Sequence, residues 1–134
     1  MVKEIGVKSR RRIELIDIST EVQRVLSESG VENGICYLYV PHTTAAITIN
    51  EAADPSVASD IERTLAKIVP EGDRSYRHTE GNSDAHIKSS MIGISEKVFV
   101  ERGNLVLGTW QGIFFCEFDG PRIRRVLIKI ISTD

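Results

Sequence analysis

The chain has 134 residues, of which 41% are apolar and 27% are charged, and its formal net charge is −2. This length suits one soluble domain with a real hydrophobic core, so we expect a single domain over residues 1–134. A sequence pI near 5.9 leaves no basic surface for extended contact with nucleic acid or with an anionic membrane. No run is long enough to span a membrane, and the first twelve residues lack the apolar centre of a secretory signal, so we expect a cytoplasmic protein.

The first third of the chain reads as two strands followed by a helix. The stretches KEIGVKS and RRIELIDI alternate polar and apolar residues, which predicts two half-buried strands that form a hairpin. The stretch STEVQRVLSESG places Val22, Val25 and Leu26 on one helical face. We expect Ser19 to cap the start of this helix and Gly30 to end it.

The next segment predicts two strands, a sharp break between them and a second helix. NGICYLYVP and TAAITIN flank a break at Pro41, which places His42 at a strand end or a tight crossing. In DPSVASDIERTLAKIVP, we expect Asp54 to cap a helix and Pro55 to occupy its first turn. The expected buried stripe of this helix consists of Val57, Ile61, Leu65 and Ile68.

A polar stretch without any period, residues 71–83, precedes a third, short helix. Long irregular loops of this kind are usually functional or disordered. SDAHIKSSMIG predicts a helix with Ser83 as its cap, with Ile87 and Met91 facing inward and His86 on another face.

The last third is rich in strands. KVFVERGNLVLG predicts a hairpin that turns at residues 102–104, GIFFCEF and RRVLIKIIS predict two more strands, and Asp119-Gly120-Pro121 predicts a turn. Two or three helices among irregularly placed strands predict an α+β fold with a mixed or mostly antiparallel sheet. Cys36 and Cys116 lie in apolar runs, so we expect both to be buried free thiols.

All three histidines lie among polar residues: His42 in VPHTTAAITINE, and His78 and His86 in YRHTEGNSDAHIKSS. Three neutral imidazoles that converge could bind zinc or a similar divalent ion and leave one position open for water or substrate. Their spacing does not match a metal-binding signature, so ordinary surface or hydrogen-bonded histidines are the alternative.

Anion binding is a second possible role for the same stretches. Thr43, Thr44 and Ser89 supply hydroxyl groups and Lys88 a positive charge, while Asn82 and Ser83 lie near a helix start, where free N–H groups attract phosphate. The alternative is that Asn82 or Ser83 simply caps the helix. Arg122 could bind a phosphate, or it could be an exposed arginine in a turn.

Carboxylates near a histidine can orient its ring, support a metal ligand or act as a general base. The candidates are Glu51, Glu80, Asp84 and Asp119, and Asp84 ranks first because it lies two residues from His86. Each of them could instead be a solvated surface acid.

Trp110 and Gln111 lie between two glycines in GTWQG. They could line a pocket in which an aromatic ring stacks on the indole while the amide contacts the edge of that ring. For Trp110 we favour core packing at a strand junction, whereas Gln111 needs a polar partner.

Three stretches together resemble the YjbQ family, whose members are also called secondary thiamine-phosphate synthases: PHTTAAITINE, HTEGNSDAHIKSS and LGTWQGIFFCEFDGPR. The resemblance covers nearly the whole chain. It implies a homotrimer of α+β subunits, a site near a subunit boundary, and a functional cluster that contains His42, His78 and His86. It also implies the transfer of a pyrimidine pyrophosphate onto a thiazole phosphate.

Three hypotheses about function follow. The first is the synthase reaction, although the chain lacks the dense acidic pair that usually holds magnesium and pyrophosphate. The second is metal-assisted hydrolysis, with His42, His78 and His86 as ligands of zinc or magnesium and with Asp84 or Glu51 as the base. The third is a trimeric module without catalysis that binds a metal or a small phosphorylated molecule.

Overall fold

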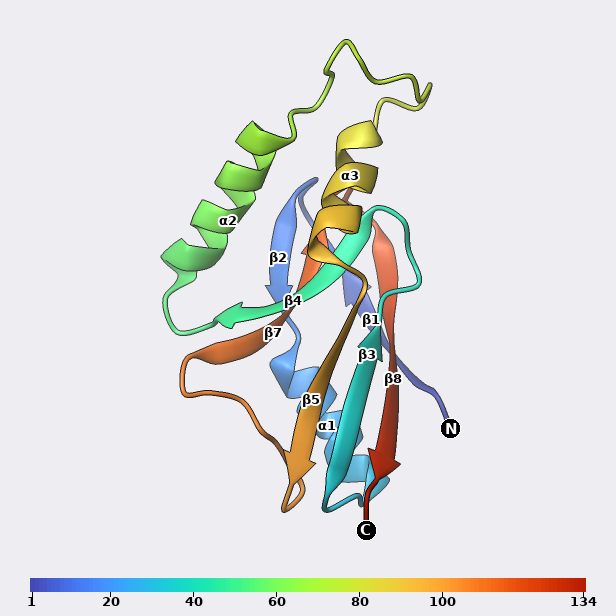
Figure 1. The fold of residues 1–134 in the computed structure, drawn as a ribbon, viewed down its shortest axis with the longest axis vertical. Helices are drawn as coiled ribbons and strands as arrows, with labels where there is room; N and C mark the ends of the chain where they lie inside the picture. Colours follow the sequence, from blue (N-terminus) through green and yellow to red (C-terminus); the bar gives the residue numbers. More distant parts are fainter.

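Two antiparallel sheets form the centre of the structure, a computed structural model that describes all 134 residues (Figure 1). One sheet has five strands in the order β1-β8-β3-β5-β6, and the other has three in the order β2-β7-β4. The strands are β1 (Lys3–Lys8), β2 (Glu14–Asp17), β3 (Gly34–Tyr39), β4 (Ala45–Glu51), β5 (Ser95–Glu101), β6 (Asn104–Leu105), β7 (Gln111–Glu117) and β8 (Ile123–Ser132), and the helices are α1 (Ser19–Ser29), α2 (Pro55–Ile68) and α3 (Ser83–Ile92). The expected α+β class is confirmed.

The main core lies between the five-stranded sheet, helix α1 and the three-stranded sheet. Alternate residues of β3, β5 and β8 point into it, and α1 adds the three apolar residues expected from its sequence, Val22, Val25 and Leu26. Helix α1 ends at Gly30, which has φ 72°, as expected. Ser19 is not its cap, because its hydroxyl instead accepts the backbone N–H of Ile113 at 2.8 Å.

Three of the connections between the two sheets, residues 9–13, 40–44 and 118–122, lie together, and we call them the crossings. The expected hairpin of the first two strands is therefore wrong: β1 pairs with β8, and β2 pairs with β7. The crossings are hydrogen-bonded to one another, since Ser9 N–H donates to the Arg122 carbonyl, Gly120 N–H to the Arg12 carbonyl and Phe118 N–H to the Thr44 carbonyl. The expectation that His42 lies at a crossing is confirmed.

Helix α2 lies against the three-stranded sheet, and a long loop joins it to α3 (Figure 1). The Asp54 side chain accepts the Ser56 N–H at 2.9 Å, which confirms the expected cap, and Pro55 is the first helical residue. Only Leu65 of the expected stripe is buried; Val57 and Ile61 are half-buried, and Ile68 is 61% exposed. None of the three helices is long and apolar enough to cross a membrane.

Helix α3 packs with its polar side inward, contrary to the sequence-based expectation. Ile87 and Met91 are exposed, whereas Asp84, Lys88 and Ser89 are buried. These polar groups tolerate burial because each has a partner: Lys88 and Asp84 bind each other, and the Ser89 hydroxyl donates to the Ala45 carbonyl at 2.6 Å. Asn82 occupies the cap position in place of Ser83, and neither side chain makes a capping hydrogen bond.

The expected turn between β5 and β6 is confirmed at Arg102 and Gly103, both with positive φ. Cys36 and Cys116 are free and buried, also as expected. Burial raises the pKa of the Cys36 thiol to about 11 and that of the Cys116 thiol to about 12, so neither is a reactive thiolate at neutral pH.

Candidate functional site

A polar pocket of about 370 Å³ opens where two of the crossings meet the start of α3. Apart from Pro41, every residue that lines it is polar or charged. We call it the crossing pocket, and its lining residues are Pro41, His42, Thr43, Thr44, Glu80, Asn82, His86, Asp119, Arg122 and Arg124. It therefore gathers eight of the residues expected from the sequence to catalyse or bind: His42, Thr43, Thr44, Glu80, Asn82, His86, Asp119 and Arg122.

His42 is held in one tautomer by the neighbouring strand. Its Nε2 accepts the backbone N–H of Arg125 at 3.1 Å, so in the neutral ring the proton must be on Nδ1. Burial lowers the pKa of His42, and the positive charge of Arg124 lowers it further. The ring is therefore neutral at physiological pH and can donate one hydrogen bond from Nδ1.

Arg124 is the most firmly held cation of the pocket and is only 7% exposed. Its Nε donates to Glu117 at 2.9 Å, and its Nη2 donates to the Thr44 hydroxyl at 2.8 Å and to the second oxygen of Glu117. The Nη1 of Arg124 makes no hydrogen bond. It is not a buried atom either, because the only buried side-chain polar atom without a partner is Asn82 Oδ1. Nη1 is therefore accessible, and because Arg124 lines the crossing pocket, we place that access there.

Glu117 is fully buried beneath Arg124 and has further donors in the Ser9 hydroxyl at 2.7 Å and the Asp119 N–H at 3.0 Å. Burial alone would raise the pKa of Glu117, but the hydrogen bonds from Arg124 and Ser9 outweigh it and the net pKa is lowered. The sequence analysis missed both Arg124 and Glu117. Two signals could have found them: Glu117 interrupts the apolar run GIFFCEF, and Arg124 lies in inward register with Val126 and Ile128.

Asn82 and Arg122 both bind Asp119, on another side of the pocket. The Asn82 Nδ2 donates to Asp119 at 2.8 Å, and the Arg122 Nη2 donates to the same carboxylate oxygen at 3.0 Å. Arg122 also donates through Nε to the Asp119 carbonyl at 2.8 Å, so the expected arginine is fixed and still half exposed.

The three histidines do not form a metal centre within one chain. The rings of His78 and His86 lie edge to face with centroids 5.3 Å apart, and His42 has its Nε2 occupied by a backbone N–H. No group of three or more His, Cys, Asp or Glu side chains is placed to bind a metal. The residues of a single chain therefore do not fit the expected zinc or magnesium site. His78 lies outside the crossing pocket, with its Nε2 3.7 Å from Glu80.

Asp84 and Lys88 lie on the buried face of α3 and do not line the pocket. Asp84 accepts two hydrogen bonds from Arg12 and one from Lys88, all at 3.0 Å. Burial alone would raise the pKa of Asp84, but these hydrogen bonds outweigh it and the net pKa is lowered. The carboxylate expected to be a base is thus held in an ion pair with Arg12 and Lys88. Together with Ser89, these residues anchor the helix that carries Asn82, Ser83 and His86.

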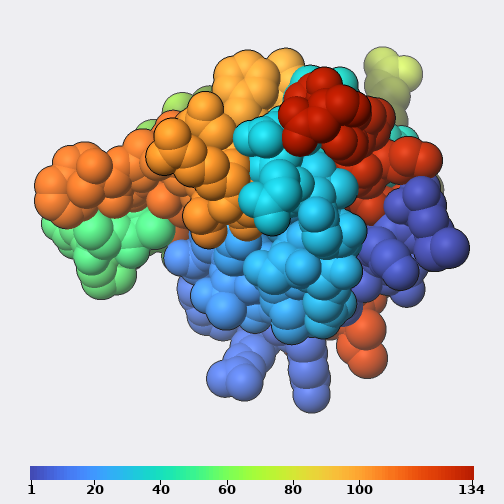
Figure 2. Space-filling model, turned by 90° about the horizontal axis from the view of Figure 1, so that it is seen from below, coloured from blue at the N-terminus to red at the C-terminus, as the bar shows by residue number.

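Glu51, Trp110 and Gln111 lie at the other end of the three-stranded sheet. In the β4–β7 ladder, Ala45 pairs with Glu117 beside the pocket, whereas Glu51 pairs with Gln111, six residues further along. That length of strand corresponds to about 20 Å. Figure 2 shows the segment before β7 (orange) and the end of β4 (green) projecting together to one side of the molecule.

Trp110 is 63% exposed on this projection, so core packing is wrong for it. The turn before β7 leaves the indole in solvent. The expected partner of Gln111 is present, since its Oε1 accepts the Gly108 N–H at 2.8 Å.

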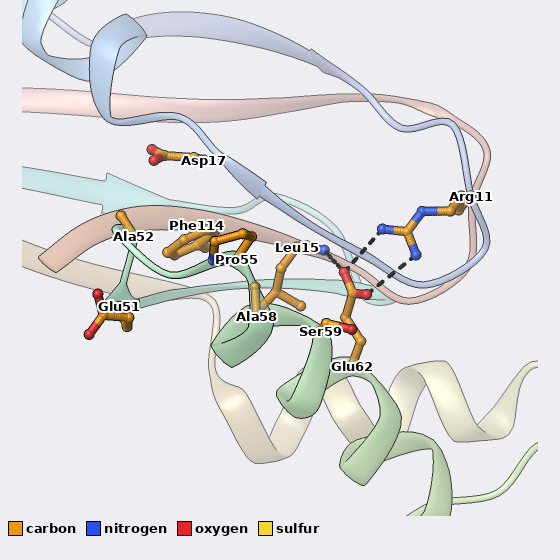
Figure 3. Close-up of a pocket in the computed structure, with 10 residues that line it drawn as sticks. All are labelled: Arg11, Leu15, Asp17, Glu51, Ala52, Pro55, Ala58, Ser59, Glu62 and Phe114. Atoms are coloured by element: carbon orange, nitrogen blue, oxygen red, sulfur yellow. Dashed lines mark hydrogen bonds and ion pairs between the residues drawn. The ribbon is translucent and has the colours of Figure 1, made fainter. Parts of the chain in front are cut away.

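Glu51 lines a second pocket, of about 510 Å³, between α2 and the three-stranded sheet (Figure 3). Leu15, Pro55 and Phe114 are apolar residues that line it, and in Figure 3 Arg11 and Glu62 pair at one end. The Glu62 carboxylate also accepts the Leu15 N–H at 2.8 Å, so this acid is used to fasten α2 to β2.

Sequence and structure comparisons agree on the relationship of the chain. The family model described as "UPF0047 protein YjbQ-like" matches residues 3–133. The chain is 51% identical to the UPF0047 protein YugU of Bacillus subtilis over 132 residues, which cover 98% of this chain and 100% of YugU. It is 43% identical to a UPF0047 protein of Archaeoglobus fulgidus over 130 residues, with 96% and 99% covered.

Two crystal structures show the same fold. A YjbQ/UPF0047 protein from Clostridium acetobutylicum matches with a TM-score of 0.94 and 50% identity, covering 96% of this chain and 99% of that one. A protein of unknown function from Sulfolobus solfataricus, described as YbjQ-like, matches with a TM-score of 0.93 and 36% identity, covering 98% and 96%. The chain therefore belongs to the YjbQ (UPF0047) family.

Proposed function

We propose that the crossing pocket binds the phosphate group of a small molecule and serves a transferase reaction on it. The observation that carries this proposal is the buried guanidinium of Arg124, which two partners hold in place while its Nη1 remains free. A charged donor that is already oriented and desolvated binds phosphate without reorganisation.

The other donors of the pocket support the same ligand. His42 offers Nδ1–H from a neutral ring, Thr43 and Thr44 carry hydroxyl groups, and Arg122 lies beside the opening. The first N–H groups of α3 have no partner within the helix and add to the positive potential at its start. A volume of about 370 Å³ is at the small end of the range typical of ligand pockets.

The candidate reaction is the one that the family resemblance implies. In thiamine-phosphate synthesis, the thiazole nitrogen forms a bond to the pyrimidine methylene carbon, and the bond from that carbon to pyrophosphate oxygen breaks. The leaving pyrophosphate needs positive charge and a proton. Arg122 and Arg124 would supply the charge, and His86, which lines the pocket, would supply the proton.

The aromatic rings of such substrates would need an apolar surface that the crossing pocket lacks, because Pro41 is its only apolar lining residue. We propose that a second copy of the chain covers them in a homotrimer. The outer face of the five-stranded sheet supports self-association, because Tyr37, Tyr39, Phe99 and Ile131 are exposed there and α1 packs only on the opposite face.

Two measurements test the proposal. Calorimetric titration with inorganic phosphate and with thiazole phosphate should give binding that weakens about tenfold or more in Arg122→Gln, because a charge-assisted hydrogen bond is lost. Arg102→Gln, in the distant β5–β6 turn, is the matched control and should bind as the wild type does. The proposed phosphate site is wrong if the two variants bind alike.

The reaction is tested by incubating the protein with the pyrimidine pyrophosphate and thiazole phosphate and measuring thiamine phosphate. We expect product from the wild type and a loss of at least tenfold in kcat for His86→Ala. His78→Ala removes the neighbouring ring, which lies outside the pocket, and should lose much less. Equal rates in the wild type and His86→Ala would remove His86 from the mechanism.

A further inference from the structure

Trp110 stands out because it is the only tryptophan of the chain and is 63% exposed. It lies on the projection that Figure 2 shows, which residues 50–54 and 108–111 form and which we call the arm. The Ala52 N–H donates to the Trp110 carbonyl at 2.8 Å, so the two parts of the arm hold each other in place. An exposed tryptophan on an ordered projection is typical of a residue that anchors a protein interface.

The arm also carries negative charge. Its only charged residues are Glu51 and Asp54. The Glu51 carboxylate accepts the backbone N–H groups of Ala53 and Asp54, and the Asp54 carboxylate accepts the N–H and the hydroxyl of Ser56. No cationic side chain of the chain pairs with either acid. The arm therefore presents an indole together with two carboxylates that lack a counter-ion.

An exposed patch of opposite charge lies on the outer face of the five-stranded sheet. In the register of that sheet, Tyr37 of β3 lies between Lys97 of β5 and Lys129 of β8. Tyr37 is 42% exposed, both lysines are exposed, and neither lysine forms an ion pair. The exposed outward residues around them are aromatic or apolar. We call this patch the tyrosine face, and its residues are Tyr37, Tyr39, Lys97, Phe99, Lys129 and Ile131.

The tyrosine face is hollowed beside Tyr37. A cavity of about 270 Å³ lies there, and its lining residues are Tyr37, Leu38, Tyr39, Ser95, Glu96 and Lys97. The two tyrosines and Lys97 suit an indole, because aromatic rings pack against one another and an ammonium group is attracted to the face of an indole. Glu96 offers an acceptor for the indole N–H, which needs a partner when it is buried. The cavity can thus receive one tryptophan side chain from another molecule.

The arm and the tyrosine face do not cover each other within one chain, because Trp110 and Tyr37 are both exposed. Contacts between like patches are unfavourable as well. Two tyrosine faces would bring the lysines of two copies together, and two arms would bring their carboxylates together. An arm on a tyrosine face joins opposite charges instead. Such a contact between copies is head-to-tail, and head-to-tail contacts can close into rings.

We infer that Trp110 of one copy inserts into the cavity beside Tyr37 of a second copy, with the carboxylates of the arm toward the lysines of the tyrosine face. This inference rests on the homotrimer of the proposed function and identifies the two surfaces that form it. Each copy then donates one arm and receives one, so a closed ring of three leaves neither surface exposed.

The fluorescence of the wild type tests the inference directly, because Trp110 is the only tryptophan. Sedimentation velocity first identifies the assembled protein, and its emission is compared with that of the double variant Tyr37→Ala/Lys97→Glu, in which the arm has no face to bind. We expect the assembled wild type to emit at shorter wavelength and to be quenched severalfold less by iodide. Emission of a fully solvated indole in the assembled wild type would overturn the inference and leave the homotrimer in place.

Two blocked variants test the head-to-tail contact. Trp110→Glu blocks the arm, and Tyr37→Ala/Lys97→Glu blocks the tyrosine face; all three side chains are exposed, so both variants should fold, as judged by circular dichroism. Each should associate about thirtyfold or more weakly than the wild type. Ile68→Glu places the same charge on an equally exposed residue of α2 and should associate as the wild type does.

An equimolar mixture of the two blocked variants should form a dimer of one copy of each and no trimer, because it contains one intact arm and one intact face. A mixture that sediments like either variant alone would contradict the head-to-tail contact, as would a Trp110→Glu variant that assembles like the wild type. A wild type that is monomeric at every concentration would overturn the homotrimer and this inference together. Calorimetric titration of the same samples with inorganic phosphate tests the crossing pocket separately, since its residues come from a single chain.

Discussion

Arg124 and Glu117 form a buried ion pair that joins the two sheets at the edge of the crossing pocket. Arg124 belongs to β8 of the five-stranded sheet and Glu117 to β7 of the three-stranded sheet, and the Arg124 Nε donates to Glu117 at 2.9 Å. Ser9 from the first crossing and Thr44 from the second bind the same pair. The ion pair therefore fixes both the contact between the sheets and the cation of the site.

Glu117→Gln should be strongly destabilising. The substitution keeps the shape of the side chain but leaves the Arg124 charge buried without its counter-ion, which costs about 3–5 kcal/mol of unfolding free energy. Urea denaturation followed by circular dichroism measures the loss. Glu4→Gln is the control, because Glu4 pairs with Arg125 at 3.0 Å on the surface and should lose at most about 1 kcal/mol. Similar losses in the two variants would contradict the role of the buried pair.

His42 should titrate below its ordinary value of 6.5, because burial and then the charge of Arg124 lower its pKa. The unfolded chain takes up a proton on this ring as the pH falls through 6.5, whereas the folded chain does so only at lower pH. The free energy of unfolding should therefore fall between pH 6.5 and the folded pKa, and His42→Gln should remove this decline. Imidazole carbon-bound proton shifts measure the pKa directly, and a value at or above 6.5 would refute the assignment.

Asp84 should contribute to stability at neutral pH and lose this contribution in acid. Burial opposes its ionisation, but the hydrogen bonds from Arg12 and Lys88 prevail and its pKa lies below the ordinary value of 3.8. The contribution is complete above that value and is lost as the pH falls through the lower, folded pKa. Asp84→Asn should thus lower stability at pH 7 and flatten its dependence on pH below 4. Asp134→Asn, at the exposed end of the chain, should leave the acid limb unchanged.

Phe99→Glu should disrupt the homotrimer that we propose while leaving the fold intact. Phe99 is 64% exposed on the outer face of the five-stranded sheet, so a charge there costs little in one chain and much in an apolar interface. Sedimentation velocity should show smaller species for this variant than for the wild type. Ile68→Glu is the control, because this equally exposed residue lies on α2, away from that sheet face. An unchanged sedimentation coefficient for Phe99→Glu would exclude this face as the interface.

Local patterns predicted the elements of the fold well and their pairing poorly. The stripe of α1, the cap of α2 and the turn at Arg102 follow from nearby residues, so the sequence reveals them. The pairing of β1 with β8 depends on distant chain segments, and alternating patterns do not tell which of two sheets a strand joins. The helical period of apolar residues also predicted the wrong buried face for α3. Asp84 can be buried because Arg12, far away in sequence, pairs with it, and a local pattern does not reveal such a partner.

The candidate site could be foreseen from its exposed polar residues and not from its buried ones. His42, His86 and Asn82 stood out because polar stretches surround them, and the structure brings them to one pocket. Arg124 and Glu117 lie inside strands with apolar neighbours, so the composition of those strands concealed them. Trp110 and Gln111 were assigned to the site by residue type alone. In the structure they lie at one end of the β4–β7 ladder, and the crossing pocket lies at the other end.

The most direct test of the phosphate site is a titration of isotope-labelled protein with glycerol 3-phosphate, followed by backbone amide NMR. We expect saturable shifts at Thr43, Thr44 and Asn82, which line the crossing pocket, and none at Glu51 or Gln111 at the far end of the three-stranded sheet. Shifts confined to the Glu51 end, or no shifts at all at millimolar ligand, would contradict the assignment of the crossing pocket as the site of phosphate binding.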